Sequence, residues 1–188
     1  MRILAKEEIN AEKNALIESI LDGAVFIYPT DTIYGLGCNA LKSEAVNKIR
    51  NLKERTKNPF SVIAPSKQWI YNNCILSEEA TEWVEKLPGP YTLILKIKKN
   101  AVAKEVNPGL GTLGIRIPAH WFGSFVAELE VPIITTSVNK SGEDFMTSLE
   151  DLDEGIKSSV DFIVYEGEKK GKPSKIIDLG NKLKITER

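Results

Sequence analysis

The sequence predicts a single α/β domain with a twisted, mixed open sheet and flanking helices. Short apolar runs typical of buried strands are interleaved with segments whose apolar residues recur at helical spacing. The two kinds of segment do not alternate strictly, which favours a mixed sheet over a purely parallel one. With 188 residues the chain is most simply one domain, 1–188, large enough to bury a sizeable core.

The composition narrows the functional classes. Hydrophobic residues make up 42% of the chain and charged residues 27%, as in soluble globular proteins. A net charge of −1 gives no overall attraction to nucleic acid or membranes, so an anion site must come from local clustering. No apolar run approaches the roughly 18 residues of a membrane helix. The N-terminus lacks a signal-like apolar region and the two cysteines lack metal-ligand spacing, so we expect a cytoplasmic protein with reduced thiols.

The first quarter of the chain is predicted to run helix, strand, loop, helix. Residues 10–22 place apolar side chains on one helical face, and Gly23 is a C-cap signal. A buried strand over residues 24–28 ends at Pro29, which cannot donate to a sheet ladder. Ser43 is predicted to cap a helix that continues to about residue 57.

The later elements follow from the same two periodicities. Ser66 and Ser77 are each predicted to open a short helix, and residues 119–129 are predicted to be helical. The pattern Ser148 to Asp151 resembles a capping box and predicts a helix reaching about residue 157. Further strands are predicted at residues 60–64, 91–97, 113–117, 132–137, 161–165, 175–178 and 183–186.

The stretch after the first predicted strand changes abruptly from apolar to polar. Thr30, Asp31 and Thr32 follow Pro29, and Gly35 and Gly37 permit close approach of a ligand to the backbone. Open α/β sheets place their ligands beyond the carboxyl ends of strands, which is where this stretch lies. An ordinary strand-to-loop turn has the same composition, so by itself the stretch leaves both interpretations open.

The cations and hydroxyls are more informative. Arg116 lies inside an otherwise apolar strand and, because unpaired burial is costly, needs either a ligand or an acidic partner. Asp31 and Asp178 are candidate partners, and we weigh the ion pair and the ligand equally. Cations together with hydroxyls at strand ends suit binding of phosphates and carboxylates. The other members of this set are Arg50, Lys53, Arg55, Lys57, Thr135, Thr136, Ser137 and Ser141.

Several short motifs do not carry function. Residues 109–114 fit G-x-G-x-x-G, but they follow a turn and lead into a strand, unlike a dinucleotide-binding loop. Residues 137–140 fit S-x-x-K without the partner motifs that serine-acylating enzymes need. His120 is the only histidine, so a multi-histidine zinc site is excluded and a helix-start or packing role is favoured. No metal-ligand cluster is predicted.

Six segments of the chain share a pattern: Tyr28–Gly37, the pair Lys53 and Arg55, Leu87–Leu93, Ile115–Pro118, Thr136–Gly142 and Pro173–Asp178. Taken together, they resemble the YrdC-like domain family, whose enzymes are threonylcarbamoyl-AMP synthases. They occur in the family's order across nearly the whole chain, which corresponds to the family's single-domain form. The resemblance implies a YrdC/DHBP synthase-like fold that encloses a large cationic cavity.

The resemblance further implies a reaction. The enzyme would be an L-threonylcarbamoyladenylate synthase, a nucleotidyltransferase that converts ATP, L-threonine and bicarbonate into threonylcarbamoyl-AMP and pyrophosphate for threonylcarbamoyladenosine (t6A) modification of tRNA. Mg²⁺ would accompany ATP without dedicated protein ligands. A downstream threonylcarbamoyl transferase complex would take the product, and tRNA is a further expected partner. The main alternative is a non-catalytic double-stranded RNA- or tRNA-binding module, against which the net charge argues.

The resemblance assigns roles to individual residues. Lys53 and Arg55 would be catalytic. The threonine would be held by Thr32, Arg116, Thr135 and Ser174. The nucleotide would be held by Lys53, Arg55, Asn58, Thr112, Ser137, Asn139 and Arg188. The sequence departs from the family pattern where Thr56 replaces a proline in a shortened loop, Ile63 replaces a histidine, Phe145 replaces a serine and Lys175 replaces a threonine.

Overall fold

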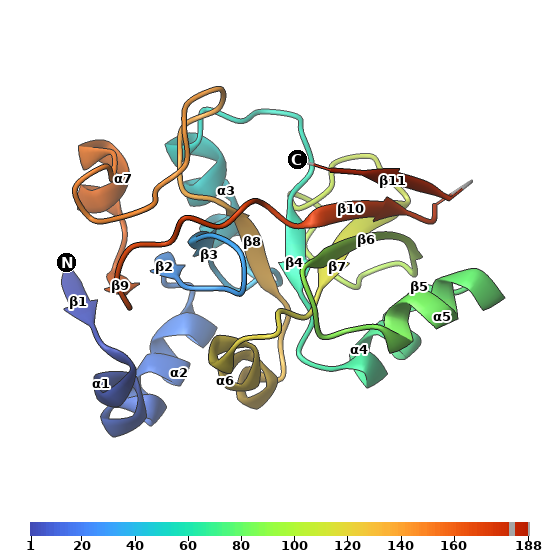
Figure 1. The fold of residues 1–188 in the computed structure, drawn as a ribbon, viewed down its shortest axis with the longest axis horizontal. Coiled ribbons are helices and arrows are strands. Elements are labelled where there is room, and N and C mark those ends of the chain that lie inside the picture. The colour runs from blue at the N-terminus through green and yellow to red at the C-terminus, as the bar shows by residue number, and fades with distance from the viewer. Residues whose placement is uncertain (181–182, 188) are drawn as a thin grey trace.

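The computed structural model describes residues 1–180 and 183–187. Their strands form one sheet in the order β1-β9-β2-β3-β8-β4-β7-β6-β10-β11, with β5 paired to β6 (Figure 1). The strands are β1 (Arg2–Leu4), β2 (Phe26–Tyr28), β3 (Gly35–Gly37), β4 (Ser61–Ile63), β5 (Cys74–Ile75), β6 (Tyr91–Ile97), β7 (Thr112–Arg116), β8 (Ile133–Ser137), β9 (Phe162–Val164), β10 (Lys175–Asp178) and β11 (Lys184–Thr186). The helices are α1 (Lys6–Ala11), α2 (Lys13–Asp22), α3 (Ser43–Leu52), α4 (Lys67–Asn73), α5 (Glu78–Glu85), α6 (Trp121–Leu129) and α7 (Glu154–Ser159).

The sheet is mixed, which confirms the predicted fold class. Parallel pairing joins β2 to β9, β4 to β7 and β6 to β10. Antiparallel pairing joins β3 to both β2 and β8, and β8 to β4. The central strands β3, β8, β4 and β7 therefore lie side by side, although they come from distant parts of the sequence.

Two apolar clusters lie on opposite faces of this sheet, because successive side chains of a strand point to opposite sides. In β2, Phe26 and Tyr28 belong to one cluster and Ile27 to the other. Buried side chains of α1, α2 and α6 complete the first cluster, and those of α3, α4, α5 and α7 complete the second. Helices thus flank both faces of the sheet (Figure 1).

Most predicted elements are confirmed, and their caps explain where they begin. The strand predicted at 91–97 matches β6, and Ser66 and Ser77 cap α4 and α5. Their hydroxyl oxygens accept hydrogen bonds from Trp69 N–H (3.0 Å) and Ala80 N–H (3.2 Å). These caps satisfy amide groups that have no partner within the helix.

Three helix predictions are wrong in their limits. The helix expected over residues 10–22 is two helices separated at Glu12, and α3 ends at Leu52 rather than near residue 57. Ser43 is the first residue of α3 and not its cap: the cap position is Lys42, whose side chain makes no capping hydrogen bond. The capping-box pattern at Ser148 forms a turn: the Asp151 carboxylate accepts from the N–H groups of Thr147 and Ser148 (3.0 and 3.1 Å). The following helix, α7, begins only at Glu154.

The polar stretch after β2 contains a strand that the sequence did not predict. Gly35 and Gly37 belong to β3, between β2 and β8. A Cβ atom on Gly37 would lie 2.5 Å from Ile134 O, and one on Gly35 would lie 2.8 Å from Tyr28 Cζ. Glycine is required here because the Tyr28 ring lies across the strand, where its hydroxyl donates to Ile134 O (2.9 Å).

Among the described helices none combines the length and the apolar character needed to cross a bilayer.

Candidate functional site

A cavity of about 160 Å³ lies where β3, β4, β7 and β8 meet. Among the described residues that line it are two arginines, Arg55 and Arg116, and no acidic side chain. Its wall is rich in hydroxyls, supplied by Thr30, Thr32, Ser61, Thr92, Thr135, Thr136, Ser137 and Ser174. Guanidinium and hydroxyl groups donate hydrogen bonds, so this wall suits an anionic or carboxylate-bearing ligand.

The structure brings together the four residues that the resemblance assigned to threonine. Thr32, Arg116, Thr135 and Ser174 all line the cavity, although they come from four separate segments. Two residues assigned to the nucleotide, Arg55 and Ser137, line the same cavity. Lys53, Asn58, Thr112 and Asn139 are not among its lining residues. Arg188 lies outside the described residues.

Lys53 is buried next to the cavity rather than in its wall. Its side chain is 2% exposed, and Nζ donates to Ser137 O (2.6 Å), Asn139 O (2.6 Å) and Asn139 Oδ1 (2.8 Å). Ser137 Oγ also donates to Asn139 Oδ1 (2.7 Å). Burial, followed by the charge of Arg55, lowers the pKa of Lys53 to about 8. The ammonium group therefore holds the end of β8, which carries Ser137 into the cavity.

Asn58 and Thr112 contact other parts of the protein. Asn58 is exposed, and its carbonyl oxygen lies 3.3 Å from Arg50 Nη1. Thr112 begins β7 opposite Lys96 of β6, and its carbonyl accepts from Asn107 Nδ2 (2.8 Å).

Arg116 has the acidic partner that the sequence left open. It forms an ion pair with Asp31, and the two side chains are 6% and 10% exposed. Arg116 Nη1 also donates to Thr32 Oγ1 (3.2 Å), whereas Nε is buried without a hydrogen-bond partner among the described residues. Burial lowers the pKa of Arg116, and the charge of Asp31 opposes that shift. Arg116 is thus charge-compensated and still carries an unused donor.

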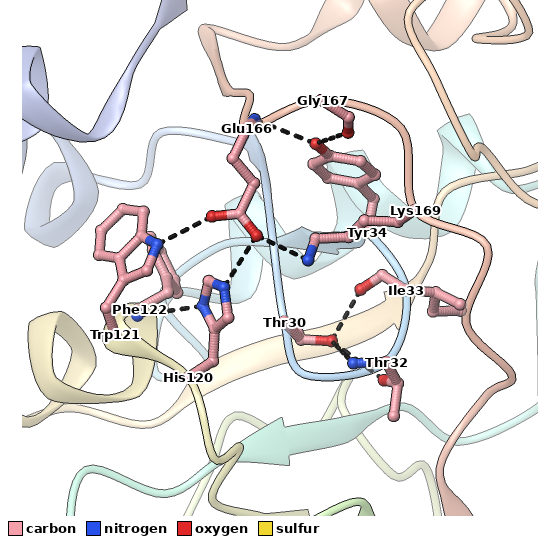
Figure 2. Close-up of polar contacts among 10 residues, drawn as sticks. All are labelled: Thr30, Thr32, Ile33, Tyr34, His120, Trp121, Phe122, Glu166, Gly167 and Lys169. Atoms are coloured by element: carbon pink, nitrogen blue, oxygen red, sulfur yellow. Dashed lines mark hydrogen bonds and ion pairs between the residues drawn. The ribbon is translucent and has the colours of Figure 1, made fainter.

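The loop after β2 is held by its own hydroxyls (Figure 2). Thr30 Oγ1 donates to Ile33 O (2.7 Å) and accepts from Thr32 N–H (3.1 Å). These bonds close a tight turn and present the Thr32 hydroxyl to Arg116.

Residues 165–174, which we call the strap, cross the sheet from β9 to β10 in front of β3 and β8 (Figure 1). Tyr34 of the cavity wall fixes the strap: its hydroxyl donates to Gly167 O (2.6 Å) and accepts from Glu166 N–H (3.1 Å). The strap in turn supplies Pro173 and Ser174 to the cavity wall. Ser174 Oγ lies 2.7 Å from Thr92 Oγ1.

Glu166 attaches the strap to helix α6 (Figure 2). Its carboxylate accepts from Trp121 Nε1 (2.9 Å) and Lys169 Nζ (2.6 Å) and lies 2.9 Å from His120 Nε2. His120 Nδ1 accepts from Phe122 N–H (3.2 Å), so Nε2 carries the proton toward Glu166. Burial lowers the pKa of His120, and Glu166 opposes that shift. His120 therefore caps α6, as its helix-start position predicted.

The sequence did not single out Glu166 or Lys169. In the sequence they form a charged pair three residues apart, which is typical of a solvated surface. Only the fold places them beside Tyr34, where Lys169 Nζ lies 5.9 Å from the centre of the ring.

The departures from the family pattern fall in different environments. Ile63 is fully buried in the apolar cluster with Tyr28 and Phe122 and does not line the cavity, whereas Phe145 does. Lys175 is exposed and pairs with Glu187 (2.7 Å).

The chemistry available at this site is binding and charge neutralisation. Within the described residues no three His, Cys, Asp or Glu side chains gather as they would around a metal ion. The described part of the cavity wall therefore offers hydrogen-bond donors for anions.

Comparison with known proteins shows what this chain is similar to. The Sua5/YciO/YrdC family model, described as "Telomere recombination", matches residues 18–188. A Methanocaldococcus jannaschii protein with the provisional name threonylcarbamoyl-AMP synthase is 35% identical over 95% of this chain and 87% of its own length. The threonylcarbamoyl-AMP synthase of Pyrococcus abyssi is 36% identical over 85% of this chain.

A solved structure shares the fold. P. abyssi Sua5 complexed with L-threonine matches with a TM-score of 0.83 and 31% identity over 95% of this chain and 54% of that one. This chain spans about half the length of the P. abyssi protein, 48% by sequence alignment.

Proposed function

The chain belongs to the Sua5/YciO/YrdC family, and we propose on this basis that it is an L-threonylcarbamoyladenylate synthase. It would form threonylcarbamoyl-AMP and pyrophosphate from ATP, L-threonine and bicarbonate, as a nucleotidyltransferase. The observation that carries the proposal is the meeting of Arg116, Thr32, Thr135 and Ser174 with Arg55 and Ser137 in one cavity. The product would serve t6A modification of tRNA in the cytoplasm, through a threonylcarbamoyl transferase complex.

The threonine would lie against β7 and the turn after β2. Its carboxylate would accept from the unused Nε–H of Arg116, which has no partner among the described residues. Its hydroxyl would bond with the hydroxyls of Thr32, Thr135 or Ser174. The complex of P. abyssi Sua5 with L-threonine supports an amino-acid site in this fold.

The nucleotide would lie toward Arg55 and Ser137. The enclosed space of about 160 Å³ is smaller than the roughly 300–1,000 Å³ typical of sites for drug-sized ligands. It therefore suits an amino acid, with ATP extending out of the enclosed part past Arg55. Four nucleotide contacts stay predictions: Asn58, Thr112, Asn139 and Arg188. The first three do not line the cavity, and Arg188 lies outside the described residues.

The chemistry follows from this placement. Bicarbonate and the threonine amine condense to a carbamate with loss of water, and a carbamate oxygen attacks the α-phosphorus of ATP while pyrophosphate leaves. The protein would hold the reactants in line and neutralise developing charge. Arg55 would contact phosphate directly. Lys53 would act through Ser137 and Asn139, whose oxygens its ammonium group holds.

Magnesium would travel with the triphosphate. The described residues provide neither a metal-ligand cluster nor a carboxylate in the cavity wall, so phosphate oxygens and water would supply its ligands.

The RNA-binding alternative is less well supported. A backbone-binding module needs several accessible basic contacts. Here Arg116 is only 5% exposed and is paired with Asp31.

Mass spectrometry of the reaction product tests the proposal. The protein is incubated with ATP, L-threonine and ¹³C-bicarbonate, and the expected product is threonylcarbamoyl-AMP carrying the label, with pyrophosphate in equal amount. Valine, which replaces the threonine hydroxyl by a methyl group, is the matched control and should give little product. Absence of any labelled adduct from the folded protein rejects the proposal.

A further inference from the structure

Five main-chain carbonyl oxygens converge on the side chain of Arg50, a buried residue near the end of α3. Its Nε donates to Glu105 O (2.7 Å) and its Nη2 to Val106 O (3.4 Å). Its Nη1 lies 2.9 Å from Arg55 O and 3.3 Å from both Thr56 O and Asn58 O. One guanidinium group thus joins the loop over residues 53–59 to the chain at 105–106.

Arg55 leaves this loop toward the cavity. Its Nη2 donates to Pro59 O (2.6 Å), and its guanidinium carbon lies 5.0 Å from the centre of the Phe60 ring. The guanidinium carbon of Arg50 lies 4.7 Å from the centre of the same ring. Phe60 is 1% exposed, and its N–H donates to Val106 O (2.8 Å), so the ring that supports Arg55 is fixed by the same chain segment that Arg50 holds.

A guanidinium group suits this arrangement better than an ammonium group does. Carbonyl oxygens that point toward one another repel, and a buried carbonyl without a donor is costly. The planar guanidinium group offers five N–H donors in a fixed fork, whereas a lysine offers three on one atom. The loop itself contains no helix or strand to hold it.

We propose that Arg50 is a positioning residue: it fixes the 53–59 loop and the Phe60 ring, and so aims Arg55 at the nucleotide end of the cavity. Arg50 does not line the cavity itself. The inference rests on the proposed function, in which Arg55 contacts the phosphates of ATP.

The test compares steady-state kinetics of wild type, Arg50→Met and Arg50→Lys. We expect Arg50→Met to raise the KM for ATP on the order of tenfold with the KM for threonine unchanged. Arg50→Lys keeps the charge but loses donors, so it should restore only part of the ATP affinity. Lys48→Met removes an exposed cation from the same helix and should behave as wild type.

A double-mutant cycle separates positioning from general stability. If Arg50 acts through Arg55, Arg50→Met adds almost nothing to the loss already caused by Arg55→Ala. If Arg50 has only a structural role, the effect of Arg50→Met adds to that of Arg55→Ala, and threonine binding becomes weaker as well. That result overturns the proposal. If Arg50→Met does not fold, Arg50→Lys decides: an unchanged KM for ATP rejects the inference. Failure of wild type to form the adduct would instead reject the proposed function.

Discussion

Arg116 and Asp31 form a buried ion pair beside the cavity, yet Arg116 keeps one buried N–H without a partner among the described residues. Asp31 is itself held by Ala119 N–H, which donates to its other carboxylate oxygen (2.9 Å). The carboxylate thus compensates the charge and orients the guanidinium group. A substrate carboxylate can add to this arrangement without displacing Asp31.

Asp31→Asn tests this division of roles. The substitution leaves the Arg116 charge buried without compensation, so the free energy of unfolding should fall by about 3 kcal/mol, measured by urea denaturation. L-threonine should raise the melting temperature of the variant more than that of wild type, because its carboxylate replaces the lost charge. Asp178→Asn is the control, since Asp178 accepts from Gly180 N–H outside the cavity. An equal threonine-induced rise in melting temperature in Asp31→Asn and wild type would contradict the prediction.

Lys53→Met tests the lowered pKa of Lys53. Burial and Arg55 bring that pKa to about 8, below its ordinary value of 10.5, so between these values the folded state binds fewer protons than the unfolded state. The contribution of Lys53 to the free energy of unfolding therefore rises as the pH increases from about 8 to 10.5. Below about pH 8 the side chain is buried in its charged form, and its contribution to stability is smallest. Urea denaturation of both proteins at about pH 7 and pH 9.5 should show wild type gaining stability relative to the variant. A constant difference would show that the pKa is not lowered.

Gly171→Ala tests the contact between the strap and the turn after β2. A Cβ atom at this position would lie 2.0 Å from Thr32 O, so the strap or Thr32 must move. We expect the KM for threonine to rise on the order of tenfold while the protein stays folded. Gly111→Ala, where a methyl group meets no atom within 4 Å, should leave threonine binding unchanged. Unaltered kinetics in Gly171→Ala would mean that the strap does not shape the site.

Glu166→Ala tests the attachment of the strap to α6. Loss of the bonds to Trp121 and Lys169 should increase hydrogen exchange of the strap amides and raise the KM for threonine a few-fold. Because the Glu166 side chain is 27% exposed, the loss of unfolding free energy should be only about 1 kcal/mol. Glu168→Ala removes a more exposed acid of the same strap, which pairs with Lys170, and is the control. Matching exchange rates in the two variants would argue against an attachment through Glu166.

The sequence predicted the elements with clear periodicity and failed where tertiary packing overrides propensity. Residues 91–97 form an apolar run that indicated β6, and the serine caps locate α4 and α5. The strand Gly35–Gly37 has no β-branched or aromatic residue, and a Cβ atom on either glycine would clash with the Tyr28 ring. Such a requirement comes from a neighbouring strand and is invisible in the local sequence.

The sequence indicated which residue types gather at the cavity but not how they are arranged there. Cations and hydroxyls at strand ends indicated an anion site, and six of the residues that the resemblance named line the cavity: Thr32, Arg55, Arg116, Thr135, Ser137 and Ser174. Lys53, Asn58, Thr112 and Asn139 do not line it. The sequence could not show that Lys53 points toward the carbonyls of Ser137 and Asn139. Nor could it choose between Asp31 and Asp178 for Arg116, because both choices satisfy the same charge requirement.

The route of the strap gives the cavity a mechanical property. The strap starts at β9 and ends at β10, and six strands of the sheet lie between these two. The strap therefore forms one wall of the pocket and also connects β9 with β10 across the sheet (Figure 1). A ligand bound at Ser174 would therefore contact a chain segment whose two ends lie in strands that are separated by most of the sheet.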